Sequence, residues 1–241
     1  MIMKIIADTH AHTLASGHAY STIREMAAAA ADQGMQVLAL TEHAPEMPGT
    51  CGLFYFQNLR VIPREMSGVR MLFGAELNIM DPKGRVDLPE STIKKLDITV
   101  ASIHVPCFGL EHTEQEVMSA YVEAMKKEYI QIIGHPDDSR FPINYEVLVR
   151  TAKETHTLLE VNNSSLHPQS FREGARENLL TMLDLCRQYE VHVTTGSDAH
   201  MDVDAGNFSY AAELLDYCHF PEELVVTTDF EKLKPFLNCK E

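Results

Sequence analysis

Nine side chains of metal-ligand type stand at or near the ends of short apolar runs along this chain. The runs read KIIADTHAH, VLALTEH, MLFGAE, ITVASIH, IQIIGH and HVTTGSDAH. Two runs close on a ligand-x-ligand pair. In an extended segment residues i and i+2 face the same side, so both members of a pair can reach one ion. The nine residues are His10, His12, His18, His43, Glu76, His104, His135, Asp198 and His200.

These ligand types indicate the chemistry. Imidazole and carboxylate without thiolate suit zinc, manganese or iron. Nine ligands are too many for one ion, and a carboxylate such as Glu76 can bridge two ions. Ions held close together clamp the attacking and leaving oxygens of a phosphoryl displacement, and they lower the pKa of bound water. The set therefore predicts a multinuclear site for phosphate esters, with the metal-bound water held by Glu76 and Asp198.

The elements that must position these residues alternate between apolar strands and amphipathic helices. Thr22 with Glu25, and Thr113 with Glu116, have the spacing of capping boxes that begin helices. Further helices are expected at 145–156, at 173–190, near 208–217 and from Asp229. Strands are expected at 3–8, 36–41, 70–75, 97–103, 130–134, 157–162 and 191–196.

The distribution of the ligands favours a closed barrel over an open sheet. Seven strand–helix units of roughly 34 residues each have the size of βαβ repeats. An open parallel sheet gathers its ligands at one switch point, whereas here six of the seven expected strands end in a ligand. The carboxyl ends of barrel strands all converge on one face. We therefore expect an α/β barrel that forms a single domain over residues 1–241.

Composition limits the partners. The chain has 241 residues, is 45% apolar and carries a net charge of −15, which disfavours general binding to nucleic acid. Bound divalent cations would reverse the charge locally and attract small anions. The five cysteines form no CxxC pair, and no apolar stretch approaches the ~20 residues of a membrane helix. The short apolar run at the N-terminus, with one lysine, is not expected to act as a signal peptide. A soluble, cytoplasmic protein without membrane contact is expected.

The motifs resemble those of a known family. DTHAHT, LTEH, GAE, SIH, GHP and GSDAH are similar to the motifs of the polymerase and histidinol phosphatase (PHP) family. HTLASGHAYST and EVNNSS resemble its small stand-alone phosphatases, which have a trinuclear zinc site. The resemblance covers nearly the whole chain and implies a distorted seven-stranded (β/α) barrel of the TIM type. It also implies three ligand sets: His10, His12, Glu76 and Asp198; Glu76, His104 and His135; and His18, His43 and His200.

Two residues beside the ligands depart from the family pattern. Glu42 stands before His43 where aspartate is common, and Thr9 stands where the family usually has an apolar residue. Glu42 and Asp8 are expected just behind the ligands, and Asp8 could orient an imidazole. The alternative for Asp8 is a turn residue at the end of the strand.

Three further residues are candidate substrate contacts. Asn162 ends the one strand without a ligand, Arg140 could hold a phosphate with two hydrogen bonds, and His167 could line the pocket. Asn162 could instead lie behind a ligand or cap a loop, and the alternative for Arg140 is a surface position. Glu42 or Asp137 could protonate the leaving group, although metal-bound water could suffice.

The expected function is a metal-dependent phosphatase. It would hydrolyse a small phosphomonoester by metal-bound hydroxide at three divalent ions, with zinc favoured over manganese or iron. The alternatives are a histidinol phosphatase, a 3′–5′ exonuclease of the PHP type, a metal-dependent amidohydrolase, or a non-catalytic metal-binding or regulatory protein. Amidohydrolases usually carry a lysine bridge, and no lysine ends an expected strand here. The expected partner is a small phosphorylated substrate, and the oligomeric state is left open.

Overall fold

The computed structural model describes residues 3–238, which build one main sheet. Its strands run parallel in the order β1-β2-β4-β5-β6-β7-β8, and the short β3 (Glu65–Met66) adds an antiparallel hairpin to β4. All seven strands expected from the sequence are present. They are β1 (Ala7–Asp8), β2 (Val37–His43), β4 (Val69–Asn78), β5 (Thr99–Ser102), β6 (Ile132–Ile133), β7 (Leu158–Asn162) and β8 (Val193–Gly196).

The two ends of this sheet meet. The Thr9 backbone N–H donates to the Thr195 carbonyl at 3.4 Å, and Thr9 Oγ1 lies 2.8 Å from Thr194 Oγ1. Just beyond β1 and β8, Ala11 and Ala199 form a parallel bridge. The sheet is therefore a nearly closed barrel, and the predicted distorted seven-stranded (β/α) barrel of the TIM type is confirmed.

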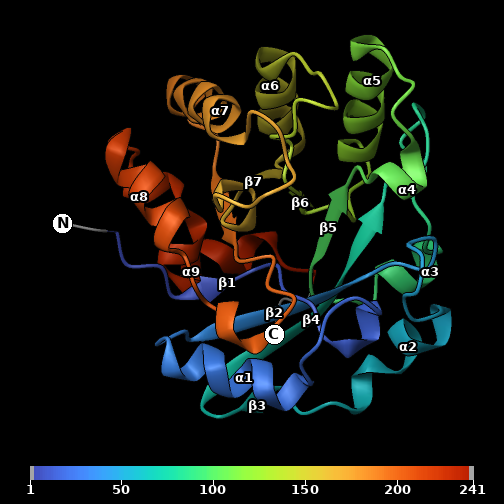
Figure 1. Ribbon diagram of the computed structural model, residues 1–241, viewed down its shortest axis with the longest axis vertical. Helices are drawn as coiled ribbons and strands as arrows, with labels where there is room; N and C mark the ends of the chain where they lie inside the picture. The colour runs from blue at the N-terminus through green and yellow to red at the C-terminus, as the bar shows by residue number, and fades with distance from the viewer. Residues whose placement is uncertain (1–2, 239–241) are drawn as a thin grey trace.

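Helices cover the outside of the barrel. Figure 1 shows α5, α6 and α7 along one side and α1 on the opposite side. Both predicted capping boxes are present, at Thr22 with Glu25 and at Thr113 with Glu116. Within residues 3–238, no helix has the length and apolar character needed to cross a bilayer. The helices are α1 (Ile23–Asp32), α2 (Leu53–Asn58), α3 (Glu90–Ile93), α4 (Val105–Phe108), α5 (Glu114–Met125), α6 (Tyr145–Thr155), α7 (Ala175–Tyr189), α8 (Ser209–Tyr217) and α9 (Phe230–Leu233).

The expected boundaries differ from the structure in a few places. β1 begins only at Ala7, because the Ile6 backbone N–H donates to Thr227 near the C-terminus rather than to a strand. β4 continues to Asn78, three residues beyond the expected end, because it stays paired with β5 up to Ser102. The sequence did not predict β3, α2, α3 and α4. These elements are two to six residues long, too short to show a periodic pattern.

The barrel interior changes from apolar to polar along its strands. Side chains two residues apart on a strand share a face. Leu158 belongs to the inner apolar cluster, so Glu160 and Asn162 continue the same inward face of β7. In β4, Leu72 belongs to that cluster and Glu76 follows on its face. The apolar floor therefore supports buried polar groups at the carboxyl ends of the strands.

One glycine on an inward face is required by close packing. A Cβ on Gly196, the last residue of β8, would lie 2.1 Å from Glu160 Oε1 and 2.6 Å from His10 Cβ. Gly196→Ala is therefore expected to lower the free energy of unfolding by about 1–3 kcal/mol, measured by urea denaturation, because buried groups must shift. The control is Gly52→Ala, whose added Cβ would have no neighbouring atom within 4 Å. Its free energy of unfolding should fall by less than about 1 kcal/mol. Equal losses in both variants would contradict this account.

Candidate metal centre

The barrel brings all nine ligand-type residues to one end. His43 is the last residue of β2, and Glu76 lies two residues before the end of β4. The other seven follow strands or lie in the loop after β1. His135 and Asp198 have φ angles of 29° and 54°, a left-handed conformation that costs a non-glycine residue of order 1 kcal/mol or more. The residues in loops and just after strands are His10, His12, His18, His104, His135, Asp198 and His200.

The Glu76 carboxylate lies at the centre of the group. Its Oε1 is 2.9 Å from His135 Nε2 and 3.2 Å from His104 Nε2. Its Oε2 is 2.7 Å from His43 Nδ1 and 3.4 Å from His10 Nε2. Burial by itself raises the pKa of Glu76, but His104, His10 and His43 together hold it well below its usual range. Glu76 is therefore a buried carboxylate that remains ionised and has imidazoles on both of its oxygens.

Partners behind the rings fix which imidazole nitrogen faces the centre. His10 Nδ1–H donates to Glu160 Oε1 at 2.8 Å, and His104 Nδ1–H donates to Asn78 Oδ1 at 2.8 Å. In the neutral ring the other nitrogen, Nε2, then has a lone pair. On both residues this nitrogen is the one that faces Glu76. The two rings are thus oriented as metal ligands usually are, with the outer nitrogen bonded to a fixed acceptor.

A similar arrangement orients His12. The Ser16 hydroxyl gives its only proton to Glu42 Oε2 at 2.7 Å. It can therefore only accept from His12 Nδ1, 3.1 Å away, and from the His43 backbone N–H at 3.0 Å. His12 Nε2 consequently presents its lone pair to Asp198 Oδ1 at 3.3 Å.

Electrostatics at this point favour a positive charge. Burial lowers the pKa of His10, but Glu160, Glu76 and Asp198 outweigh burial and raise this pKa well above its usual value. Burial, together with His43 and His200, keeps the pKa of His12 well below its usual value, so His12 stays neutral. A protonated imidazole or a divalent cation could supply the positive charge that the carboxylates favour.

Two buried atoms test whether a metal fits here. Glu76 Oε2 and His43 Nδ1 lie 2.7 Å apart, yet neither makes a hydrogen bond of acceptable geometry within residues 3–238. A buried polar atom without a partner costs about 1–3 kcal/mol, and a cation would supply the missing partner. Three groups of residues have their ligand atoms within 4.8 Å of one another. They are His12, His43 and His200; His10, His12 and Glu76; and His43, Glu76 and His104.

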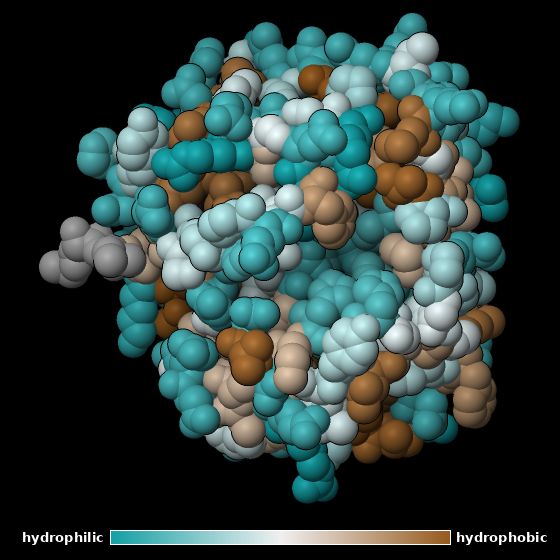
Figure 2. All heavy atoms as spheres, in the orientation of Figure 1, coloured by the Kyte–Doolittle hydropathy of each residue, from teal (hydrophilic) through white to brown (hydrophobic). Residues whose placement is uncertain are grey.

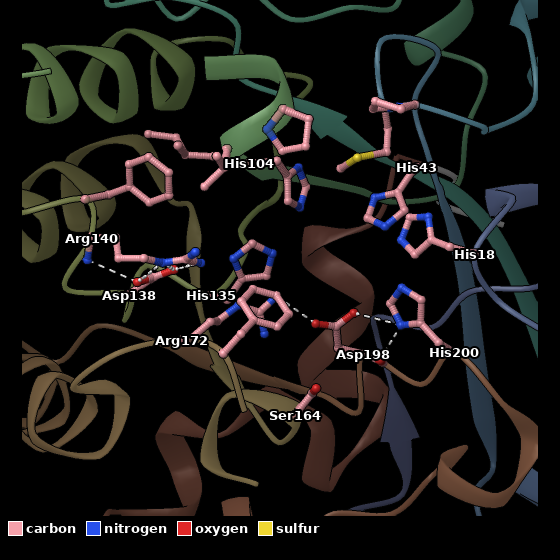
Figure 3. A pocket seen from close by; sticks show the side chains of 17 residues that line it. His18, His43, His104, His135, Asp138, Arg140, Ser164, Arg172, Asp198 and His200 are labelled. Atoms are coloured by element: carbon pink, nitrogen blue, oxygen red, sulfur yellow. Dashed lines mark hydrogen bonds and ion pairs between the residues drawn. The ribbon is translucent and has the colours of Figure 1, made fainter. Parts of the chain in front are cut away.

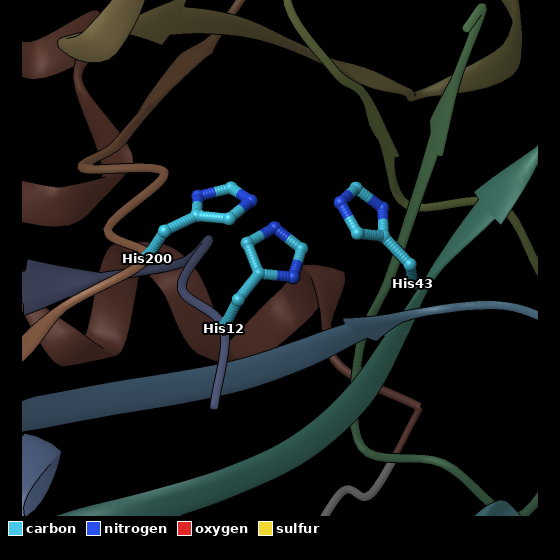
Figure 4. A group of neighbouring side chains, drawn as sticks. All are labelled: His12, His43 and His200. Atoms are coloured by element: carbon cyan, nitrogen blue, oxygen red, sulfur yellow. The ribbon is translucent and has the colours of Figure 1, made fainter. Parts of the chain in front are cut away.

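The first of these groups differs from the set that the family resemblance implies. Figure 4 shows His12, His43 and His200 with their rings close together. The resemblance assigns His18, not His12, to this set. The His18 ring stacks on His43 and His200 with centroid distances of 4.8 and 5.0 Å, and His18 is exposed at the side of the cavity. His18 is therefore adjacent to the group and is the ligand-type residue most open to solvent.

Asp8 and Glu42, the two residues expected just behind the ligands, accept hydrogen bonds from groups other than imidazoles. Asp8 accepts hydrogen bonds from the backbone N–H groups of His10, Ser197 and Gly206, at 3.0–3.2 Å. Burial raises the pKa of Asp8 to about 6. Glu42 accepts from Ser16 and from both the backbone and the hydroxyl of Thr13. Asp8 thus fixes the loop that carries Asp198, and Glu42 fixes the loop that carries His12.

A cavity of about 510 Å³ opens beside the cluster. Figure 3 shows His18, His43 and His200 on one side of it and Arg140 with Asp138 on the other, and Figure 2 shows the hollow in the molecular surface. Arg140 lines the cavity, with its Nε 2.9 and 3.0 Å from the two carboxylate oxygens of Asp138.

The other candidate contacts lie away from this cavity. Asn162 is fully buried and donates to Asp198 Oδ2 at 3.2 Å and to Glu160 Oε2 at 3.1 Å. His167 is exposed and lines a separate cavity of about 260 Å³. Asp137 is also fully buried, and burial raises its pKa to about 7. The structure therefore brings only Arg140 of the three candidates into the main cavity.

Two residues that contact the proposed ligands, Glu160 and Arg172, were not predicted from the sequence. Glu160 is fully buried and accepts from His10 Nδ1, and from the His135 backbone N–H at 2.7 Å. Its signal was available, because it is a charged residue inside the apolar strand LLEVN. Arg172 donates to Asp198 Oδ2 at 2.9 Å and to Ser165 Oγ at 3.1 Å. Its side chain is only 7% exposed, and no pattern in its loop indicates this.

Comparison with known proteins identifies the family. The model of the PHP domain matches residues 8–170. The chain belongs to the PHP family. A probable phosphatase from Clostridium novyi is 43% identical over 238 residues, which cover 99% of this chain and 96% of that protein. A probable phosphatase from Caldanaerobacter subterraneus is 43% identical over 240 residues, which cover 100% and 94%.

A solved structure has the same fold as this PHP chain. It is histidinol phosphate phosphatase from Lactococcus lactis, complexed with zinc, L-histidinol and phosphate. It aligns with a TM-score of 0.62 at 17% identity and covers 89% of this chain and 94% of its own. The predicted PHP membership and the predicted class, a hydrolase of the phosphatase type, are confirmed by the family match and the names of the relatives.

The role of Glu160 in this PHP site can be tested. In Glu160→Gln an amide NH₂ must face either His10 Nδ1–H or the donors His135 N–H and Asn162 Nδ2, so two donors oppose each other. Metal affinity is expected to fall about 10- to 100-fold, measured by elemental analysis after dialysis against buffered zinc.

The control for this variant is Glu154→Gln. Glu154 is an exposed residue of α6, and its substitution should leave metal content unchanged. Thermal unfolding of both proteins checks that they remain folded. Full metal affinity in Glu160→Gln would exclude the proposed role of Glu160.

Proposed function

We propose that this chain is a metal-dependent phosphatase that hydrolyses a small phosphomonoester at a site of three divalent ions. The observation that carries the proposal is the buried convergence on Glu76, where Glu76 Oε2 and His43 Nδ1 have no hydrogen-bond partner within residues 3–238. Five imidazoles surround this one carboxylate. Their nitrogens lie 2.7–3.5 Å from its oxygens, at His10, His12, His43, His104 and His135.

The ligands divide among the three ions as the family motifs imply. Glu76 belongs to the first and second sets and would bind an ion of each. We favour zinc, with manganese or iron as alternatives, since the donors are imidazole nitrogens and carboxylate oxygens. The sets are His10, His12, Glu76 and Asp198; Glu76, His104 and His135; and His18, His43 and His200.

Divalent ions, when bound, neutralise phosphate oxygens and make water acidic enough to act as a nucleophile near neutral pH. In the overall reaction a water oxygen forms a bond to phosphorus, the ester P–O bond breaks, and the alcohol leaves with a proton. The chain's own residues prepare this site. Glu160 holds the Nδ1 proton of His10, and Arg172 holds one oxygen of Asp198 so that the other faces His12.

Arg140 is the proposed substrate contact within the cavity. Asp138 occupies its Nε and Nη2, and its Nη1 has no ion-pair or hydrogen-bond partner within residues 3–238. Nη1 is thus the donor atom free for a substrate. Asn162 and His167 are assigned other positions, Asn162 beneath Asp198 and His167 at the smaller neighbouring cavity.

We also propose that residues 1–241 form one PHP unit. The family match ends at residue 170, but the barrel path continues through β8. Asp198 and His200, both beyond the match, face the same cluster as His12. A piece ending at residue 170 would therefore lack two of the nine proposed ligands.

Metal removal tests the proposed function. Chelator-treated protein is expected to release no phosphate from p-nitrophenyl phosphate, and zinc or manganese should restore release. In the reconstituted protein, Glu76→Gln should lower turnover by at least about 100-fold and reduce bound metal. The substitution replaces one carboxylate oxygen by an NH₂ group, which cannot bind a metal ion. The exposed Glu154→Gln serves as the matched control. Full activity in metal-stripped protein would overturn the proposal.

A second substrate separates the proposal from its rivals. Single-stranded DNA is expected to be a poor substrate, because the net charge of −15 repels a phosphate backbone. Preferred cleavage of DNA would instead indicate an exonuclease. Full metal occupancy without turnover of any phosphate ester would indicate a regulatory or metal-binding role.

A further inference from the structure

The cavity beside the cluster has an apolar wall that the phosphate chemistry does not use. Its volume of about 510 Å³ is in the range of sites for small molecules. The cluster forms one side and can engage the phosphate group. Much of the remaining surface is hydrocarbon, from Met47, Ile103, Val105, Phe141 and Phe171. The leaving group of a substrate would therefore meet a largely apolar surface.

The charged side chains that line the cavity are already paired. Arg140 forms a two-pronged ion pair with Asp138 through Nε and Nη2. Arg172 donates from Nη2 to Asp198 Oδ2 at 2.9 Å. Apart from histidines, these four are the only formally charged residues that line the cavity within residues 3–238. The wall therefore has no spare full charge with which to select a charged leaving group.

Phe171 is held in place although it is 70% exposed. The centre of its ring lies 5.2 Å from Cζ of Arg140 and 5.3 Å from Cζ of Arg172, within the range of cation–π attraction. Two guanidinium groups, each fixed by a carboxylate, therefore hold an exposed aromatic ring at the cavity. Covering such a ring with an apolar ligand group would remove hydrocarbon surface from water.

From these contacts we propose the substrate class: an ester of phosphate with an uncharged alcohol that carries an apolar group about the size of a phenyl ring. Phe171, Phe141 and Ile103 contact this group, and the phosphate faces the cluster. The inference rests on the proposed phosphatase function and adds the chemical nature of the leaving group. It places a polyhydroxylated or charged alcohol at a disadvantage, because Arg140 Nη1 can bind one polar group while the others would lose water against the apolar part of this wall.

Three esters of primary alcohols test the substrate class without large differences in leaving-group chemistry. They are 2-phenylethyl phosphate, glycerol 1-phosphate and phosphoethanolamine, assayed by phosphate release with zinc-loaded protein. The kcat/KM for 2-phenylethyl phosphate is expected to exceed that for each of the others by at least about 10-fold, the scale of discrimination in apolar pockets. Equal values, or a preference for a polar ester, would overturn the inference and leave the phosphatase function standing. Absence of release from every phosphate ester would contradict the function itself, and the inference with it.

Substitution at Phe171 tests the contact. In Phe171→Ala the ratio of kcat/KM between 2-phenylethyl phosphate and glycerol 1-phosphate should fall about 5-fold or more, because the apolar surface is lost. Phe171→Leu keeps much of that surface and should keep most of the ratio. The control is Phe54→Ala, a substitution of a phenylalanine that is 76% exposed and does not line the cavity. A wild-type ratio in Phe171→Ala would remove Phe171 from the proposed site.

Discussion

The convergence of buried imidazoles on the ionised Glu76 carboxylate is the constraint on which the site depends. His10, His12 and His104 are each held by an outer partner so that Nε2 faces inward. Without a proton or a cation, their lone pairs would face the Glu76 carboxylate at distances of 3.2–3.5 Å. Such an arrangement is unfavourable by itself and becomes favourable when cations occupy the space between the donors. The loops and strands around the site can therefore be understood as supports for a cluster that favours a positive charge at its centre.

The barrel supplies this support because its strands are parallel and nearly closed. Inward faces carry small or branched apolar residues at the floor and polar ones at the carboxyl ends, as Leu158 and Glu160 do on β7. Glu160 reaches both His10 and the backbone of His135 from this position. The close approach of Gly196 lets β8 pack against the same carboxylate. Stability of the fold and geometry of the site are thus linked through shared residues.

The proposed function depends on the contrast between the two sides of the cavity. The cluster concentrates charge, whereas the opposite wall is apolar and has its ion pairs already satisfied. In phosphate ester hydrolysis the phosphoryl group takes most of the charge, and the alcohol determines specificity. This division fits a charged cluster that could act on the phosphate of many esters, combined with an apolar wall that selects among their alcohols.

The sequence by itself determined the seven main strands, both capping boxes and the residues of ligand type, and the spread of those residues over the strand ends favoured a barrel. The strands and capping boxes depend on local propensity and on patterns among a few neighbouring residues, whereas the barrel was inferred from ligands spread along the whole chain and from the resemblance to the PHP family. Short helices such as α4 were not predicted, because four residues are too few to show a periodic hydrophobic pattern.

Only the tertiary structure decided the partners of the ligands. Arg172 reaches Asp198, and Ser16 relays between Glu42 and His12. Asp8 binds backbone amides rather than an imidazole, and Arg140 enters the cavity while His167 does not. These outcomes depend on how loops from distant parts of the chain meet over the barrel. Their hydrogen bonds join residues far apart in sequence, so no local pattern could specify them.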